Sequence, residues 1–314
     1  MARFAIRRLG SMALVLFAVS VLTFLIFNVI PNNDPAERMA GRTTTQTEIE
    51  AIRKEWKFDE PVYEQYLTTM EKIFTGDLIS YTTRLNVVEE IGKGIPRTFS
   101  LAIGAAIIWM AFGVALGLFS AVRAGGISDR LLTALALIGI SMPVFWIGAL
   151  MNHYLGFEAG IFPNGGYVEL TEDPIDWFYH LIMPWLALAI LYIGIYSRVL
   201  RSNILDTVNE DYVRTARAKG LSERRVLVGH VLRNSLIPIT TLMAFDFAGV
   251  VGGAIITENV FGWQGMGTLF TKGLREVDPA PVMAFFLVSG AAIVTFNMLA
   301  DIAYAYLDPR IRLS

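Results

Sequence analysis

The chain has 314 residues, of which 54% are hydrophobic and 17% charged, and its formal net charge is −2. A mean hydropathy of +0.51 lies far above that of a water-soluble domain and indicates a membrane protein. Because the sequence contains no cysteine, disulfides, thiolate metal sites and cysteine nucleophiles are excluded.

Six apolar stretches are long enough to cross a bilayer core, which needs roughly 20 helical residues. They are Gly10–Ile30, Thr98–Val122, Leu131–Leu150, Leu181–Ser197, Ile237–Thr257 and Pro281–Ala300. The first exceeds the apolar core of a signal peptide and no small-residue cleavage site follows it, so we interpret it as a retained span. The fourth is the shortest and holds Pro184. The sequence therefore predicts an all-α membrane protein with six transmembrane helices.

The charges of the loops predict the orientation of these spans. With the N-terminus inside, the cytoplasmic segments 1–9, 123–130, 198–236 and 301–314, leaving out Asp301, hold 15 Lys or Arg against 6 Asp or Glu. The outside segments 31–97, 151–180 and 258–280 hold 11 Lys or Arg against 20 Asp or Glu. Both termini are therefore expected in the cytoplasm.

The external segment 31–97 carries helix signals of its own. Thr47 and Glu50 have the spacing of a capping box. A later helix is expected to place four apolar side chains on one face and to end at Gly76; the four are Tyr63, Tyr66, Leu67 and Met70. We interpret the segment as a small cap packed on the membrane domain, with a partner-facing surface as the alternative.

A basic helix–break–helix segment separates the fourth and fifth spans. Gly220 stands where the first helix would end in a left-handed conformation, and Ser222 is placed to cap the second helix, with Glu223 in its first turn. Two interpretations follow: a docking surface for a cytosolic partner, or an amphipathic helix that touches only lipid headgroups. The spacing alone does not separate them.

Motifs for catalysis are absent from the sequence. It has no phosphate-binding Gly-x-x-x-x-Gly-Lys-Ser/Thr loop, no His-Glu-x-x-His and no Gly-x-Ser-x-Gly. Its three histidines, His153, His180 and His230, lie far apart in sequence, so we expect no metal site. The basic residues are explained by membrane topology, and nucleic-acid binding is not expected.

The segment Asp211–Ser222, with Leu232–Leu236 and Pro238, resembles the cytoplasmic loop of binding-protein-dependent ABC-transporter permeases. It is similar to the first permease subunit of the peptide/nickel branch. Of the superfamily pattern Glu-Ala-Ala-x-x-x-Gly, only the second alanine (Ala216) and the glycine (Gly220) are present here. Further matching segments run along essentially the whole chain; they include Pro96–Ala102, Ser141–Phe145, Gly253–Phe261 and Asp308–Arg312.

The resemblance implies a type I ABC importer permease fold in a prokaryotic plasma (inner) membrane. The implied partners are a second homologous permease subunit, two cytosolic ATPase subunits and an external solute-binding protein. ATP and Mg²⁺ would be bound by the ATPases, so this chain would hold no cofactor and would not itself be an enzyme. The implied substrates are di- or oligopeptides, with nickel chelates, glutathione or oligosaccharides as alternatives in the same family.

The resemblance and the residue pattern together predict three groups of site residues. The coupling segment that contacts the ATPase comprises Asp211, Tyr212, Arg214, Thr215, Ala216, Arg217, Ala218, Lys219, Gly220, Leu221 and Ser222. The seam along the pathway and the second permease comprises Asp246, Ala248, Gly249, Gly252, Gly253 and Glu258. The outer-gate loop comprises Phe261, Trp263, Gly265 and Gly267.

Each of these groups has a structural alternative. Small residues four apart allow close helix packing within one chain as well as between chains. Asp246, as an intramembrane carboxylate, needs water or a polar partner, so a hydrogen bond to a neighbouring helix competes with substrate contact. Phe261 and Trp263 suit a membrane interface, and an aromatic belt that merely anchors the loop is the alternative to a gate.

Three parts of the chain follow from these predictions. Residues 1–30 form the cytoplasmic N-terminus and first span, 31–97 the external insert, and 98–314 a five-helix permease core with the cytoplasmic loop 198–236. A secondary transporter is the alternative from another class, but it would need an ion site and inverted repeats. A membrane-embedded enzyme would need paired catalytic groups, whereas Asp246 is the one charged residue within its span.

Overall fold

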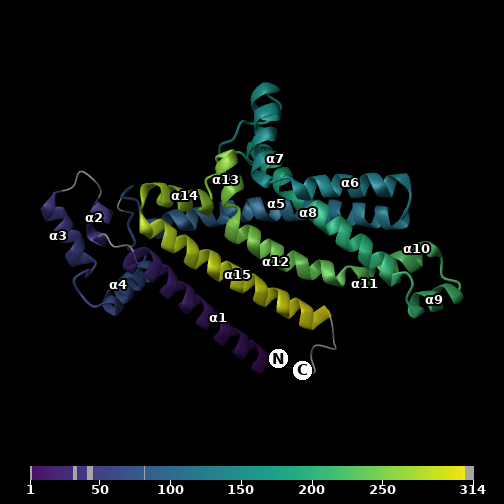
Figure 1. Ribbon diagram of the computed structural model, residues 1–314, viewed down its shortest axis with the longest axis horizontal. Helices are drawn as coiled ribbons and strands as arrows, with labels where there is room; N and C mark the ends of the chain where they lie inside the picture. The colour runs from purple at the N-terminus through teal and green to yellow at the C-terminus, as the bar shows by residue number, and fades with distance from the viewer. Residues whose placement is uncertain (1, 31–33, 41–44, 81, 308–314) are drawn as a thin grey trace. The chain divides into compact units, whose positions relative to one another are not determined.

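The computed structural model describes residues 2–30, 34–40, 45–80 and 82–307, without side-chain surroundings for 2–8, 38, 39, 253 and 300–307. Within these residues every regular element is helical, apart from one antiparallel bridge between Ile79 and Asn86 (Figure 1). The chain divides into two compact units. Unit 1 holds Met1–Phe99 with Val251–Met298, and unit 2 holds Ser100–Val250 with Leu299–Ser314.

In the part of the chain that the structure describes, four helices are each long and apolar enough to cross a membrane. They are α1 (Ala2–Phe24) with its π-helical extension η1 (Leu25–Val29), α5 (Val87–Val122), α8 (Pro174–Thr207) and α15 (Pro279–Leu307). Two bent helix pairs raise the number of spans to six if each pair is one span. The fold is thus all-α, as predicted.

The first bent pair interrupts the predicted span Leu131–Leu150. Here α6 (Ile127–Ser141) meets α7 (Val144–Met151), which continues as η2 (Asn152–Glu158), at an angle of 97°. Met142 is extended, with φ −91° and ψ 128°, because the ring of Pro143 disfavours a helical residue before it and removes a backbone donor. The stretch predicted as the third span is therefore a bent pair of helices and not one straight helix.

The fourth span is longer than the apolar run Leu181–Ser197 predicts. Its helix α8 begins at Pro174, where the Asp173 carboxylate caps it by accepting from the backbone N–H groups of Ile175 and Asp176, both at 3.0 Å. Pro184 lies inside α8 and does not end it. Polar first and last turns carry the helix beyond the apolar stretch at both ends.

The second bent pair leads from the basic segment into the fifth span. It comprises α10 (Glu223–Val226), η3 (Leu227–Leu232) and α11 (Arg233–Ser235), which meet α12 (Ile237–Gly253) at 44°. Before it stands α9 (Asp211–Ala218), and after α12 come α13 (Ile255–Phe261) and α14 (Met266–Glu276). Pro238 falls in the first turn of α12, where its missing N–H costs no helical hydrogen bond.

The external insert forms α2 (Pro35–Ala40), α3 (Gln46–Glu55) and α4 (Val62–Thr75). The cap of α3 is Thr45, not Thr47 as predicted: the Glu48 carboxylate accepts from the Thr45 backbone N–H at 3.2 Å. The left-handed end of α4 at Gly76 is confirmed, with φ +82°. The predicted boundary between residues 97 and 98 lies within α5, which runs through Pro96 without a break.

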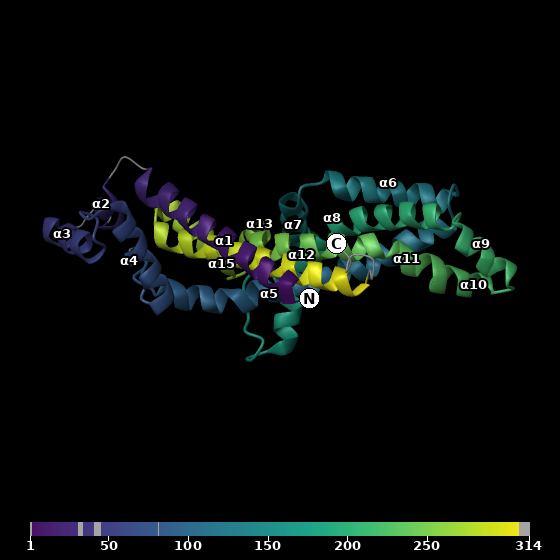
Figure 2. The same cartoon turned by 90° about the horizontal axis from the view of Figure 1, so that it is seen from below.

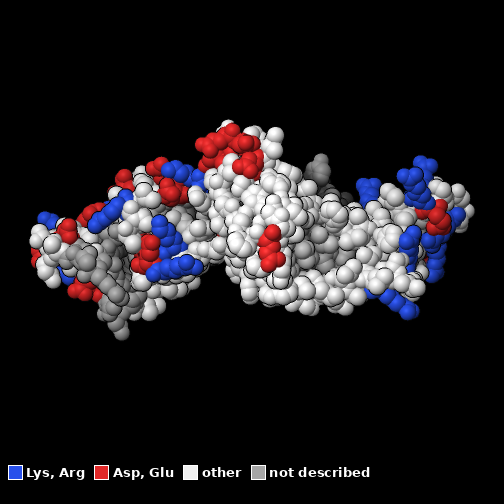
Figure 3. All heavy atoms as spheres, turned by 90° about the horizontal axis from the view of Figure 1, so that it is seen from above, with Lys and Arg blue, Asp and Glu red and all other residues white. Residues whose placement is uncertain are grey.

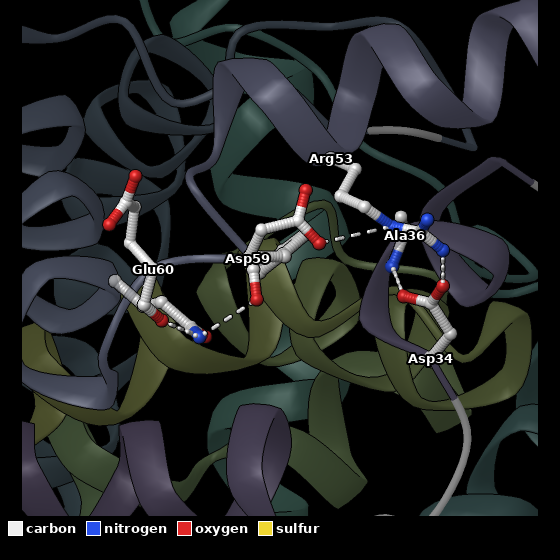
Figure 4. Close-up of polar contacts among 7 residues, drawn as sticks. Asp34, Ala36, Arg53, Asp59 and Glu60 are labelled. Atoms are coloured by element: carbon white, nitrogen blue, oxygen red, sulfur yellow. Dashed lines mark hydrogen bonds and ion pairs between the residues drawn. The ribbon is translucent and has the colours of Figure 1, made fainter.

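One arginine ties the start of the insert to α3, its second helix. The Arg53 guanidinium donates to Asp34 and lies 3.8 Å from Asp59, while the Ala36 N–H donates to Asp34 at 2.9 Å (Figure 4). The Asp34 carboxylate raises the pKa of Arg53. Because the insert has no disulfide, these polar contacts and a buried cluster around Trp56, Leu78 and Ile91 hold it in place.

Candidate functional site

Helix α9 presents a polar surface and buries a narrow apolar one. Val213 and Ala216 are buried at 0% and 5% exposure, three residues apart on one face. The other α9 side chains of the coupling segment are exposed, with Asp211 97% and Arg214 68% exposed. Lys and Arg side chains gather over α9 and α10 (Figure 3). Of the predicted coupling residues, Ala216 thus supports the helix and is not available to a partner.

The break after α9 is a left-handed glycine, as predicted. Gly220 has φ +80°, and its N–H donates to the Arg217 carbonyl at 2.9 Å. Across the break, Arg217 Nε donates to Glu223 Oε1 at 2.9 Å. Ser222 occupies the cap position of α10, but its side chain makes no capping hydrogen bond; that part of the prediction is wrong. The hinge is therefore held by one backbone conformation and one ion pair.

The coupling segment is joined to the spans on both sides of it. Asn234 of α11 donates to the Tyr212 hydroxyl at 2.7 Å, and Asn203 of α8 donates to the Ser235 carbonyl at 3.3 Å. These hydrogen bonds connect α9 to α11, and α11 to α8. Sequence reasoning placed Asn234 in the resembling segment but gave it no role, and it missed Asn203, because contacts across about 20 to 30 residues leave no periodic signal.

A buried ion pair fixes the same end of α8. Asp129 of α6, 3% exposed, accepts from Arg201 Nε and Nη2 at 2.7 and 2.8 Å. It also accepts from the Ser120 hydroxyl and, at 2.8 Å, from the Gly125 N–H. The carboxylate thus joins α5, α6 and α8, and loss of its partners would leave a buried polar group unsatisfied, which is costly.

Asp246 has a polar partner inside the chain. The Tyr196 hydroxyl of α8 donates to Asp246 Oδ2 at 2.8 Å, and the Tyr196 side chain is fully buried. This contact is the helix–helix hydrogen bond that the sequence left open. A role in contacting substrate stays a prediction.

The small residues of α12 do not form one uniform surface. Ala248 is buried at 2% exposure, whereas Gly249 is exposed and a Cβ on it would meet nothing within 4 Å. A Cβ on Gly252 would lie 3.0 Å from Ile293 Cδ1 of α15. The surroundings of Gly253 lie outside the described residues. Gly252 therefore packs within the chain, whereas Gly249 is open in this chain. Its place in a seam with a second permease stays a prediction.

Glu258 of α13 is the centre of a buried clamp, fully covered at 0% exposure. Thr98 Oγ1 donates to Glu258 Oε1 at 2.5 Å, and the Thr268 N–H donates to Glu258 Oε2 at 3.0 Å. The Met266 N–H in turn donates to Thr98 Oγ1 at 3.0 Å. Burial raises the pKa of Glu258 to about 7. Within unit 1 the carboxylate joins α5, α13 and α14.

The outer-gate loop is packed around this clamp. A Cβ on Gly265 would lie 2.2 Å from Glu258 Oε1, and one on Gly267 would lie 2.6 Å from Ile255 Cα. Trp263 is 0% exposed and donates from Nε1 to the Arg97 carbonyl at 3.0 Å; Phe261 is 2% exposed. Both aromatic rings are therefore internal to unit 1 and are not free to contact lipid as an anchoring belt would. A role of this loop in an outer gate stays a prediction.

Among the described residues, no three His, Cys, Asp or Glu side chains are placed to hold a metal ion.

Acidic side chains gather on the 151–180 loop (Figure 3), at a part of unit 2 distant from the basic α9 and α10. The orientation of the chain in the bilayer stays a prediction.

Comparisons with known proteins identify the family. Residues 113–313 match the family described as binding-protein-dependent transport system inner membrane component, and residues 1–102 match its N-terminal family. A probable D,D-dipeptide transport system permease of Escherichia coli K12 is 35% identical, covering 97% of this chain and 96% of that protein. The oligopeptide transport system permease of Bacillus subtilis 168 is 35% identical (99% of each). The glutathione transport system permease of Escherichia coli O6:H1 strain CFT073 is 34% identical (99% of each). The chain therefore belongs to the inner-membrane permeases of binding-protein-dependent ABC transporters.

Proposed function

We propose that this chain is one of two permease subunits of an ATP-driven importer of di- or oligopeptides, coupled to cytosolic ATPases through α9. The observation that carries the proposal is the construction of the coupling segment: exposed polar side chains on α9, a left-handed Gly220, and the hydrogen bond from Asn234 of α11 to Tyr212. A helix that touched only lipid headgroups would present apolar residues outward, whereas Val213 and Ala216 point into the chain.

The coupling is mechanical. Closure of the two ATPases displaces α9, and the rigid connection through α11 passes this displacement to α12 as a rotation of the bundle. ATP and Mg²⁺ belong to the ATPase subunits, and an external solute-binding protein delivers the substrate. The relatives named above as D,D-dipeptide, oligopeptide and glutathione permeases support a peptide or peptide-like substrate.

The test is ATP-dependent uptake by the reconstituted complex of this chain, a second permease and the ATPases, supplied with an external solute-binding protein. Uptake of a labelled peptide that stops with vanadate supports the proposal. Uptake driven by an ion gradient in the absence of ATP would instead indicate a secondary transporter.

A further inference from the structure

The last turns of α8 are connected on two sides within unit 2. Asn203 donates to the Ser235 carbonyl of α11 at 3.3 Å, and the Ser235 hydroxyl donates to Thr207 Oγ1 at 3.2 Å. Arg201 donates from Nε and Nη2 to the two carboxylate oxygens of Asp129, on α6, at 2.7 and 2.8 Å. These three α8 residues all fall within its last seven positions. This end of α8 is therefore a junction between α11 and α6.

Further hydrogen bonds extend the connection in both directions. Asn234 of α11 donates to the Tyr212 hydroxyl of α9 at 2.7 Å. At the other end, Asp129 also accepts from the Ser120 hydroxyl of α5. A series of polar contacts thus leads from the coupling segment through α11 and α8 to α6 and α5.

Close backbone contacts join α5, α6 and α8 farther along α8. A Cβ on Gly117 of α5 would lie 2.7 Å from the Ser197 carbonyl oxygen. A Cβ on Gly194 would lie 2.8 Å from the Ala136 carbonyl oxygen of α6. Small residues let helix backbones approach this closely, and α6 and α8 lie side by side (Figure 2). The three helices are therefore packed against one another as one body.

Beside the ion pair, however, this packing is incomplete. A hollow of about 160 Å³ is lined by residues of all three helices, among them Ser120, Leu132, Thr133, Ser197 and Arg201. An arginine that meets a carboxylate through two parallel hydrogen bonds fixes orientation as well as distance. The ion pair thus holds α6 against the end of α8 where apolar side chains leave a gap.

We propose that Asp129 and Arg201 are positioning residues, which make α5 and α6 follow α8 when the coupling segment is displaced. The inference rests on the proposed coupling of α9 to an ATPase. A displacement of α9 reaches the end of α8 through α11, and the ion pair joins that end to α6. Connected networks of packed and hydrogen-bonded side chains can carry coupling between distant sites. The three helices then turn together as one rigid body.

The first test separates the link from the stability that it supplies. The double variant Asp129→Asn with Arg201→Met removes the contact between α6 and α8 and leaves no charge without its partner. The new amide oxygen at position 129 can still accept from the Ser120 hydroxyl. Because both partners are replaced, we expect nearly normal amounts of assembled complex. Glu55→Gln with Lys72→Met, which removes a 2.7 Å ion pair of the insert, is the matched control.

Peptide uptake and ATP hydrolysis are measured on the same proteoliposomes of the assembled transporter. We expect uptake per ATP hydrolysed to fall several-fold in the double variant and to stay unchanged in the control. A double variant with the uptake per ATP of the unaltered chain would show that the pair only stabilises the fold, and would overturn the proposal. If the unaltered complex took up no peptide with ATP, the proposed function would fail, and this inference with it.

A second measurement does not depend on folding of the double variant. The chain has no cysteine, so Arg130→Cys on α6 and Asp206→Cys on α8, both exposed positions, carry two spin labels once the partner subunits are made cysteine-free. We expect electron paramagnetic resonance to give the same distance between the labels with and without ATP and vanadate. A distance that changes with nucleotide would show that α6 does not follow α8, and would overturn the proposal.

Discussion

The hydroxyl of Tyr196 donates a 2.8 Å hydrogen bond to the carboxylate of Asp246 and so joins α8 to α12. Its position matters because α8 leads into the coupling segment and α12 leads out of it. A carboxylate at this depth is costly without such a partner. The pair therefore ties together the two helices that the coupling segment would move.

Tyr196→Phe removes the hydroxyl that donates to Asp246 and so leaves the carboxylate without this hydrogen bond. An unsatisfied buried polar group lowers the stability of a protein by about 1–3 kcal/mol. We expect a lower thermal midpoint of the purified complex, while Asp246→Asn, which keeps an acceptor for Tyr196, has a smaller effect. Tyr192→Phe, one turn away on α8, is the matched control. An Asp246→Asn variant that is stable but transports nothing would show that the charge itself acts on the substrate.

Gly220→Pro should uncouple ATP hydrolysis from uptake. Proline fixes φ near −65° and has no N–H, so it excludes both the φ of +80° and the hydrogen bond to the Arg217 carbonyl. Insertion and assembly should persist, because the position is exposed. Peptide uptake and ATPase activity are measured on the same proteoliposomes; undiminished uptake per ATP hydrolysed would contradict the hinge.

Gly125 supplies a control for backbone strain. It has φ +81°, and a Cβ would meet nothing within 4 Å at either glycine. Gly125→Ala and Gly220→Ala therefore carry the same left-handed strain, about 1–2 kcal/mol, but only the second lies in the coupling segment. We expect a larger loss of uptake per ATP in Gly220→Ala; equal losses would indicate a general effect of instability.

Local signals were enough to predict much of the fold. Apolar length located the spans, and glycine at a helix end predicted the left-handed turns at Gly76 and Gly220. The angle at Met142 was within reach as well, since Pro143 stands in the middle of an apolar run. The cap of α3 was predicted at Thr47, two residues after its actual position at Thr45, because both threonines have a glutamate three residues later.

Tertiary partners were beyond such reasoning. Trp263 is an aromatic residue beside glycines, and this local sequence does not show whether its ring lies at a membrane interface or is buried against Arg97. The partners of Asp246 and Glu258 come from helices 50 and 160 residues earlier. The same holds for the small residues of α12, whose spacing is identical for packing within and between chains.

Gly249→Leu and Gly252→Leu should separate these two kinds of packing. Gly249 is open in this chain, so leucine there leaves the chain's own fold intact and hinders the approach of a second permease. Leucine at 252 collides with Ile293 and disturbs this chain itself. Co-purification of the second permease measures the effect of Gly249→Leu on assembly. The thermal midpoint of the complex measures the effect of Gly252→Leu on stability. Normal assembly with Gly249→Leu would remove Gly249 from the seam.

Gly265→Ala should destabilise unit 1 severely. The added Cβ would lie 2.2 Å from Glu258 Oε1 and 2.5 Å from Thr98 Oγ1, and overpacking of this kind costs typically 1–3 kcal/mol or more. Gly92→Ala on α5, where a Cβ meets nothing within 4 Å, is the matched control. The amount of folded complex recovered in detergent measures the difference; equal recovery would contradict the clamp.

The stability of the clamp should depend on pH through Glu258. Burial raises its pKa from 4.5 to about 7 in the folded chain, so the folded state binds the proton more tightly than the unfolded state. Its contribution is therefore fully present below about pH 4.5 and is lost as pH rises through about 7. The loss of folding stability is on the order of 3 kcal/mol.

We expect the thermal midpoint of the complex to fall between about pH 5 and about pH 8. Glu258→Gln cannot titrate, so its midpoint should change less over the same range. Parallel midpoint curves for the two proteins would show that Glu258 does not bind a proton on folding.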